Sequence, residues 1–236
     1  MNELQIKYKN EIEELVEACH RLAALGYVTS SGGNLSYRLE ENLILITPTK
    51  TPKRRMRFED ICFIDADGNV VYAPAGKKPT GETPFHVRIM CMRPDVRAIV
   101  HAHPPILTGF AIAGTDLMER PFLPEPILEV GPMLNVAYAT PLSEELSENF
   151  DAVIHKSNGF LMQNHGALVC NVNEITEAVE HMEMMEAMAQ SICVAKVLGK
   201  ANEIAPERIR ALDEVIAVRN LKLPGTEVTS LAELYK

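Results

Sequence analysis

The hydrophobic positions near the N-terminus recur at intervals of three and four residues. Ile12, Leu15, Val16, Cys19, Leu22 and Ala23 all follow this spacing. That period places apolar side chains on one face of a helix. The pattern predicts an amphipathic helix over residues 3–25, and Gly26 is the residue at which we expect it to stop.

Short apolar runs bounded by turn residues follow, and they predict β-strands. Asp67 and Gly68 form a turn of the kind that joins two strands of a hairpin. The predicted strands are Leu35–Leu39, Leu43–Ile46, Ile61–Ile64, Val70–Tyr72, Ala98–Val100, Phe160–Met162 and Ala167–Cys170.

Helical patterns alternate with these strands. Ser143 and Asn173 are suitable N-cap residues, and the tail over residues 220–236 is polar and predicted to be irregular. The alternation predicts one α/β domain over residues 1–236, with a sheet covered by helices. The predicted helices are Glu82–Met92, Ile106–Ile112, Ser143 to about His155, Asn173 to about Leu198, and roughly 207–219.

Charge and cysteine content narrow the class of protein. A formal net charge of -9 argues against a nucleic-acid binder, because phosphate backbones are held by excess Lys and Arg. Five scattered cysteines without a CxxC pair indicate reduced thiols, so we expect a cytoplasmic protein. The N-terminus is densely charged, and the uncharged stretch 98–115 contains two prolines; we therefore expect neither a signal peptide nor a membrane span.

Two histidines stand two positions apart where a buried strand ends. Residues of a strand alternate between its faces, so the imidazoles of His101 and His103 lie on one face and can share an ion. A single histidine in an apolar run is usually a satisfied core residue, but two on one face would be costly to bury without a partner. His165 stands between two further apolar strands and is the candidate third ligand.

Glu82 follows Pro79-Thr80-Gly81 and opens a predicted helix. A carboxylate there could complete a metal site or move a proton, although a glutamate favoured by the helix dipole explains the spacing equally well. The turn Ser30-Ser31-Gly32-Gly33-Asn34 could bind a phosphate or carboxylate, or simply connect two elements.

Five positive charges lie between residues 50 and 57 of this acidic chain. They form either a solvated loop or a rim that attracts anions; the residues are Lys50, Lys53, Arg54, Arg55 and Arg57. The remaining histidines fall within or near helix patterns, and we assign them structural roles; they are His20, His86, His155 and His181.

The segments SSGGNLS, LITPT, PTGETPFH, VHAHPP and QNHGALV, in this order, resemble the class II aldolases of the L-fuculose-phosphate aldolase and ribulose-phosphate 4-epimerase group. The similarity runs from about residue 10 to about residue 195. It implies a three-layer α/β/α domain with a mainly antiparallel central sheet. It also implies a homotetramer with active sites at subunit boundaries.

The resemblance implies roles for individual residues. His101, His103 and His165 match the family's metal ligands, and Glu82 matches a carboxylate that ligates the resting metal and then acts as acid/base. The positions that match those holding the family's substrate phosphate are Ser31, Asn34, Thr49 and Thr80, and Gly32, Lys50 and Gly81 complete the predicted substrate-binding set. One divalent ion per chain is expected. Zinc suits the ligands best, and manganese, iron or cobalt also fit.

Three departures from the fuculose enzymes concern the substrate pocket. Those enzymes have Gly where Lys50 stands, Ser where Gly81 stands, and a proton-relay Tyr that aligns with Glu125. Tyr235 is the candidate for the family's C-terminal tyrosine. We expect a lyase that cleaves a small ketose phosphate or related hydroxy-ketone. The alternatives are another metal-enolate reaction (decarboxylation, dehydration, epimerisation or hydrolytic ring opening) or a non-catalytic adducin-like domain.

Overall fold

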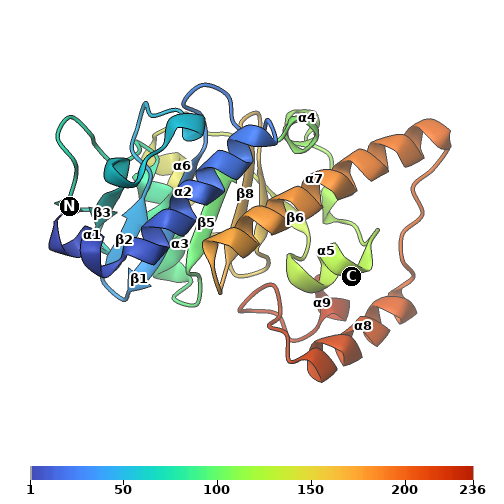
Figure 1. The fold of residues 1–236 in the computed structure, drawn as a ribbon. Coiled ribbons are helices and arrows are strands. Elements are labelled where there is room, and N and C mark those ends of the chain that lie inside the picture. The colour runs from blue at the N-terminus through green and yellow to red at the C-terminus, as the bar shows by residue number, and fades with distance from the viewer. Residues whose placement is uncertain (1, 236) are drawn as a thin grey trace.

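The computed structural model describes residues 2–235 and has one sheet at its centre (Figure 1). The strand order is β4-β3-β2-β1-β5-β8-β7-β6. Every neighbouring pair is antiparallel except β6 and β7, which are parallel. The strands are β1 (Asn34–Glu40), β2 (Leu43–Ile46), β3 (Cys62–Ile64), β4 (Val70–Tyr72), β5 (Ala98–Ala102), β6 (Met133–Val136), β7 (Gly159–Met162) and β8 (Gly166–Asn171).

Helices cover both faces of this sheet. On one face lie α2 (Lys9–Ala24), α4 (Pro105–Ala113) and α7 (Ile175–Leu198), and on the other lie α3 (Thr83–Met92) and α6 (Glu144–Glu148). Neighbouring residues of β5 illustrate the division, because Val100 belongs to the first core and Ile99 to the second. The expected α/β fold with a mostly antiparallel sheet is confirmed.

A smaller cluster holds the C-terminal part of the chain. Ile127 and Leu128 of α5 (Pro124–Glu129) pack with Ile209 of α8 (Pro206–Arg219) and Leu231 of α9 (Leu231–Leu234). Figure 1 shows these helices below α7, and α5 is the one that packs against it. No helix among residues 2–235 is long and apolar enough to cross a membrane.

The predicted helix over residues 3–25 is wrong in one respect. The helix is interrupted at Tyr8, which has φ −109° and ψ 35° and separates α1 (Glu3–Lys7) from α2. The Tyr8 hydroxyl donates to Glu40, and its ring packs 6.3 Å from the ring of Phe63. Tertiary contacts of this one side chain therefore override the helical period.

Two other helix predictions also need correction. The helix capped by Ser143 ends at Glu148, and the chain then turns so that Phe150 and Ile154 enter the second core. The long helix begins after Glu174, because Asn171 Oδ1 accepts from the backbone N–H groups of residues 173 and 174. The tail contains the short helix α9, whose N-cap is Ser230.

Several short elements were not predicted. They are β6, α5 and the 3₁₀ turns η1 (Lys53–Arg55), η2 (Phe58–Asp60) and η3 (Leu117–Glu119). Each has six residues or fewer, so none shows a full hydrophobic period. The two prolines of α5 also argue against a helix when only the sequence is considered.

Candidate metal and active site

The centre of the sheet carries His101 on β5, between β1 and β8. His103 follows just after the strand on the same face, and its backbone N–H donates to Tyr27 O at 2.8 Å. His165 lies in the tight turn that joins β7 to β8, where Met162 pairs with Gly166. The turn is closed by a 3.0 Å hydrogen bond from His165 N–H to Met162 O.

The three predicted histidines come together. One ring nitrogen from each of His101, His103 and His165 lies within 4.8 Å of the others, and no other such group of His, Cys, Asp and Glu occurs among residues 2–235. The Nε2 atoms of His101 and His103 are 3.2 Å apart. Two nitrogens bound to one tetrahedral zinc ion at bond lengths of about 2.0–2.1 Å would be about 3.3 Å apart, so the spacing fits.

The protonation of these rings also suits a metal. His101 Nδ1 lies 3.0 Å from Ala167 O, so this nitrogen carries the proton and leaves the lone pair on Nε2. Burial lowers the pKa of His101 well below its usual value and lowers that of His103 as well. Both rings are therefore neutral near pH 7. His165 Nδ1 is buried and lacks a hydrogen-bond partner within the described part of the chain.

Glycines allow the backbone to approach the histidines closely. Gly33 has φ +67°, and a Cβ there would lie 2.8 Å from His101 O. A Cβ at Gly166 would lie 2.5 Å from His103 Cδ2 and 2.6 Å from Ala102 O. A side chain at either position would displace the histidine-bearing strand.

Glu82 lies beside the histidines at the N-cap of α3. Its Oε2 is 3.6 Å from His101 Nε2, and its Oε1 is 3.5 Å from His165 Nε2. The residue is 8% exposed. Asn34, which pairs with His101 across β1 and β5, donates from Nδ2 to Glu82 Oε2 at 2.5 Å. The carboxylate can therefore complete a fourth metal position or carry a proton next to it.

We call the predicted substrate-binding residues Ser31, Gly32, Thr49, Lys50, Thr80 and Gly81 the rim. Among them, Thr80 Oγ1 accepts from the backbone N–H of Glu82. A Cβ on Gly32 would lie 3.1 Å from His103 Nδ1, so the SSGGN turn touches the histidines, and Ser31 of that turn is exposed. Thr49 and Thr80 belong to two segments joined by the Pro48–Pro79 bridge. A Cβ at Gly81 would lie 2.9 Å from Leu142 Cδ2, the end of an exposed side chain that can move aside, so the structure leaves room for a small side chain there.

The basic segment divides into exposed and buried parts. Lys50 is exposed and lines a hollow that also receives Arg55 and Lys77. It adopts φ 54°, a left-handed conformation that suits the Gly of the fuculose enzymes. Lys53 is only 2% exposed, so the solvated-loop interpretation is wrong for this residue.

Lys53 is a buried cation near the histidine cluster, and its burial was not predicted. Its charge contributes to the low pKa of His101 and His103, and it interacts with the charge of Glu82. Burial lowers the pKa of Lys53 itself. Its side chain makes no hydrogen bond or ion pair within residues 2–235, so its charge is available to an anion.

His86 was also missed as a site residue, having been assigned only a structural role. It is fully buried, and its Nε2 lies 2.5 Å from Asn34 Oδ1 while its Nδ1 lies 2.7 Å from Ser36 Oγ. Burial lowers its pKa to about 3, so the ring is neutral. The signal was the spacing, because positions 82 and 86 face the same side of a helix.

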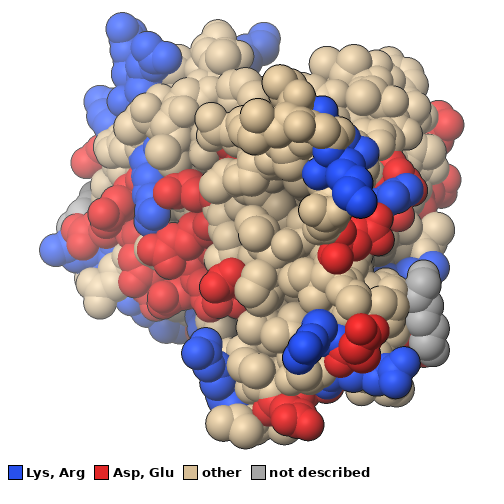
Figure 2. Space-filling view, turned by 90° about the vertical axis from the view of Figure 1, so that its right-hand side faces the viewer, with Lys and Arg blue, Asp and Glu red and all other residues tan. Residues whose placement is uncertain are grey.

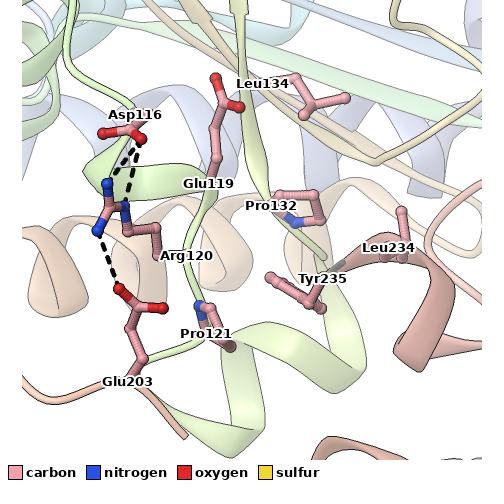
Figure 3. A pocket seen from close by; sticks show the side chains of 9 residues that line it. All are labelled: Asp116, Glu119, Arg120, Pro121, Pro132, Leu134, Glu203, Leu234 and Tyr235. Carbon is pink, nitrogen blue, oxygen red and sulfur yellow. Dashed lines mark hydrogen bonds and ion pairs between the residues drawn. The ribbon is translucent and has the colours of Figure 1, made fainter. Parts of the chain in front are cut away.

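Glu125 and Tyr235 do not join the histidines within one chain. Glu125 is exposed in the first turn of α5. Tyr235 lies with the C-terminal cluster and lines a separate pocket with Pro121, Pro132 and Arg120 (Figure 3). Burial raises the pKa of Tyr235. In this pocket Arg120 is held between Asp116 and Glu203 (Figure 3).

Known proteins are similar to this chain in both sequence and fold. L-fuculose phosphate aldolase of Methanococcus maripaludis is 34% identical over 180 residues, which cover 76% of this chain and 94% of that protein. The 3-oxo-tetronate 4-phosphate decarboxylase of Haemophilus influenzae is 32% identical over 170 residues, covering 70% and 78% of the two chains.

Solved structures of related proteins have a similar fold. YgbL of Klebsiella pneumoniae, a putative aldolase/epimerase/decarboxylase, has a TM-score of 0.79 at 27% identity, covering 86% of this chain and 98% of its own. An L-fuculose 1-phosphate aldolase has the same TM-score at 26% identity, with 88% and 96% covered. The family described as Class II Aldolase and Adducin N-terminal domain matches residues 13–193. The relatives named above are an aldolase and a decarboxylase, and the histidines cluster as the resemblance implied. The chain belongs to this class II aldolase family.

Proposed function

We propose that this chain is a metal-dependent lyase that cleaves a small ketose phosphate, or a related hydroxy-ketone, by a retro-aldol reaction. The observation that carries the proposal is the convergence of three imidazoles and the Glu82 carboxylate on one point. A divalent ion at that point, zinc being the best match, polarises substrate oxygens and stabilises the negative charge that develops when the bond breaks.

Glu82 handles a proton in this proposal. When the C–C bond breaks, the carbon next to the carbonyl keeps the electron pair and the other fragment leaves as an aldehyde. The hydroxyl that becomes the aldehyde must lose its proton, and the first carbon must gain one. Glu82 is the carboxylate beside the histidines, and it can take up a proton and return it to this carbon. Its Oε2 is held by Asn34, which leaves Oε1 for the proton.

The substrate is proposed to be anionic. Lys53 supplies a buried positive charge that acts on His103, Gly32 of the SSGGN turn approaches His103, and Lys50 adds an exposed positive charge. The proposed binding residues are the rim residues together with Asn34. Turns of this kind offer backbone N–H groups and hydroxyls that suit a phosphate or a carboxylate. Glu125 and Tyr235 remain candidates for the proton on the aldehyde side, acting across a subunit boundary.

From the resemblance we also propose that the chain forms a homotetramer in the cytoplasm. Figure 2 shows the face at the end of α7 and α8, where wide areas lack Lys, Arg, Asp and Glu. Val197 and Leu198 at the end of α7 and Val218 of α8 are more than 80% exposed. Exposed apolar residues of this kind are typical of surfaces that contact another protein.

Decarboxylation is the second candidate, and the relationship to the 3-oxo-tetronate 4-phosphate decarboxylase favours it. Both reactions leave an electron pair on a carbon next to a carbonyl, and both require a proton donor such as Glu82. A panel of phosphorylated and unphosphorylated ketoses and 3-oxo acids separates them, with the bound metal assayed alongside. Release of an aldehyde supports the retro-aldol proposal, release of CO₂ overturns it in favour of decarboxylation, and neither product overturns both.

A further inference from the structure

A chain of buried polar groups runs from β1 through α3 to Glu82. His86 stands between two residues of β1 that are two apart and therefore share a face, Asn34 and Ser36. The His86 ring stacks on the ring of Phe85, with centroids 4.6 Å apart. The next contact is the 2.5 Å hydrogen bond from Asn34 to Glu82.

Only one arrangement of donors and acceptors is possible along these hydrogen bonds. An ionised carboxylate can only accept, so the Asn34 atom that faces Glu82 is the Nδ2 amide group. Asn34 Oδ1 must then accept, and the His86 Nε2 that faces it carries the ring proton. His86 Nδ1 is left as an acceptor for the Ser36 hydroxyl. One tautomer of His86 satisfies every group.

We propose that His86 is a positioning residue, whose Nε2–H tautomer fixes the Asn34 amide so that Asn34 holds Glu82 Oε2 beside the histidines. The proposal rests on the proposed role of Glu82 and goes beyond it. His86 touches neither the histidine cluster nor the rim residues by any hydrogen bond, and acts through Asn34.

The alternative orientation shows why the tautomer matters. With the proton on Nδ1, the His86 lone pair would face Asn34 Oδ1 at 2.5 Å, and two acceptors would repel each other. Rotating the amide to relieve this contact would aim Oδ1 at the Glu82 carboxylate instead. Glu82 would then lose its donor and its fixed position.

His181 provides a matched control. It is another buried histidine on a helix, and its Nδ1 lies 3.4 Å from an asparagine amide, Asn171 Nδ2. Its other nitrogen lies 3.3 Å from Glu129 Oε2, away from the histidine cluster. Replacing it removes a comparable buried ring without disturbing the hydrogen bonds that link His86, Asn34 and Glu82.

The first test compares kcat, KM, bound metal and melting temperature in variants of the metal-loaded protein. We expect His86→Leu to lower kcat by up to about 100-fold, with KM and bound metal little changed, because a misplaced catalytic group costs that much. His86→Gln, whose amide can donate to Asn34 Oδ1, should recover most of the loss. His181→Leu should lower the melting temperature and leave kcat unchanged.

A double-mutant cycle shows whether the effect passes through Asn34. In an Asn34→Ala background, His86→Leu should cost little further kcat. Additive losses, or equal losses in His86→Leu and His86→Gln, would overturn the proposal. Ser36→Ala keeps the ring and removes only the hydroxyl, so it carries the test if His86→Leu does not fold; there we expect a loss of several-fold.

A second test does not depend on activity. Nitrogen-15 NMR of labelled histidines in the metal-loaded protein reports which nitrogen of His86 carries the proton. We expect the proton on Nε2 in the wild type and a mixture of tautomers in Asn34→Ala, which removes the acceptor that faces Nε2. A proton on Nδ1 in the wild type overturns the positioning role even if the enzyme is active. A correct tautomer in a protein that cleaves none of the substrates overturns the proposed reaction alone.

Discussion

The histidine half of the site and its rim are held in different ways. His101, His86 and Asn34 are at most 3% exposed and are fixed by strand pairing and hydrogen bonds. Ser31, Thr49 and Lys50 are exposed and lie on turns. In the proposed reaction, bond cleavage would therefore take place at the buried centre of the sheet, while the exposed rim residues could differ from one substrate to another.

Removing a metal ligand should give the largest effect. We expect His103→Ala to lower metal affinity by more than about 100-fold, since loss of an outer partner alone typically costs 10–100-fold. The measurement is metal content per chain after dialysis against a weak chelator. His20→Ala is a suitable control, because His20 lies on α2 and bonds Met56 O. Full occupancy in His103→Ala would contradict the assignment.

The buried half should also respond to pH. Burial holds the pKa of His86 at about 3, whereas an unfolded histidine titrates near 6.5. The unfolded chain therefore binds more protons between these values, and stability is complete above pH 6.5 and falls as the pH drops towards 3. Between pH 6.5 and 5, His86 alone should cost about 2 kcal/mol in the metal-free protein.

Urea denaturation of metal-free protein at the two pH values measures this loss. His86→Gln cannot titrate in this range, so its stability should fall by about 2 kcal/mol less than that of the wild type. Equal losses in the two proteins would show that His86 is already accessible to protons in the folded state.

The rim should show the smallest effect. Lys50→Ala should raise KM by several-fold at low salt, and the difference should shrink at high salt because the contact is exposed. Lys50→Gly should raise KM equally and, by relieving the left-handed backbone, stabilise the fold by about 1 kcal/mol. Lys78→Ala, an exposed neighbour, should do neither. A KM unaffected by Lys50→Ala at every salt concentration would return Lys50 to a solvated loop.

Much of the fold could be predicted because its signals are local. The runs at Leu43–Ile46 and Val70–Tyr72 are strands with the predicted bounds. His101 at the end of β5 and His103 just after it also reveal their shared face through the period of two. Short elements such as β6 gave no period, and the interruption at Tyr8 depends on contacts with Glu40 and Phe63 that lie far along the chain.

The parts of the site that were not predicted also depend on contacts between residues far apart in the sequence. Lys53 stands in a run of charges, and only the packing of η1 against α2 shows that its side chain is buried. His86 has the helical spacing from Glu82, but the partners that give it a role, Asn34 and Ser36, lie about fifty residues earlier. A sequence shows such spacings, whereas the fold decides which groups meet.

Glu82→Gln tests the central claim most directly, with metal content and kcat measured on the same sample. Gln is nearly isosteric and can offer one oxygen to an ion, but it cannot accept and return a proton. The account predicts that the ion and the fold are retained while kcat falls by about 10²–10⁴-fold and KM changes little. Near-normal kcat in the metal-replete variant would contradict it, because another group would then be moving the proton.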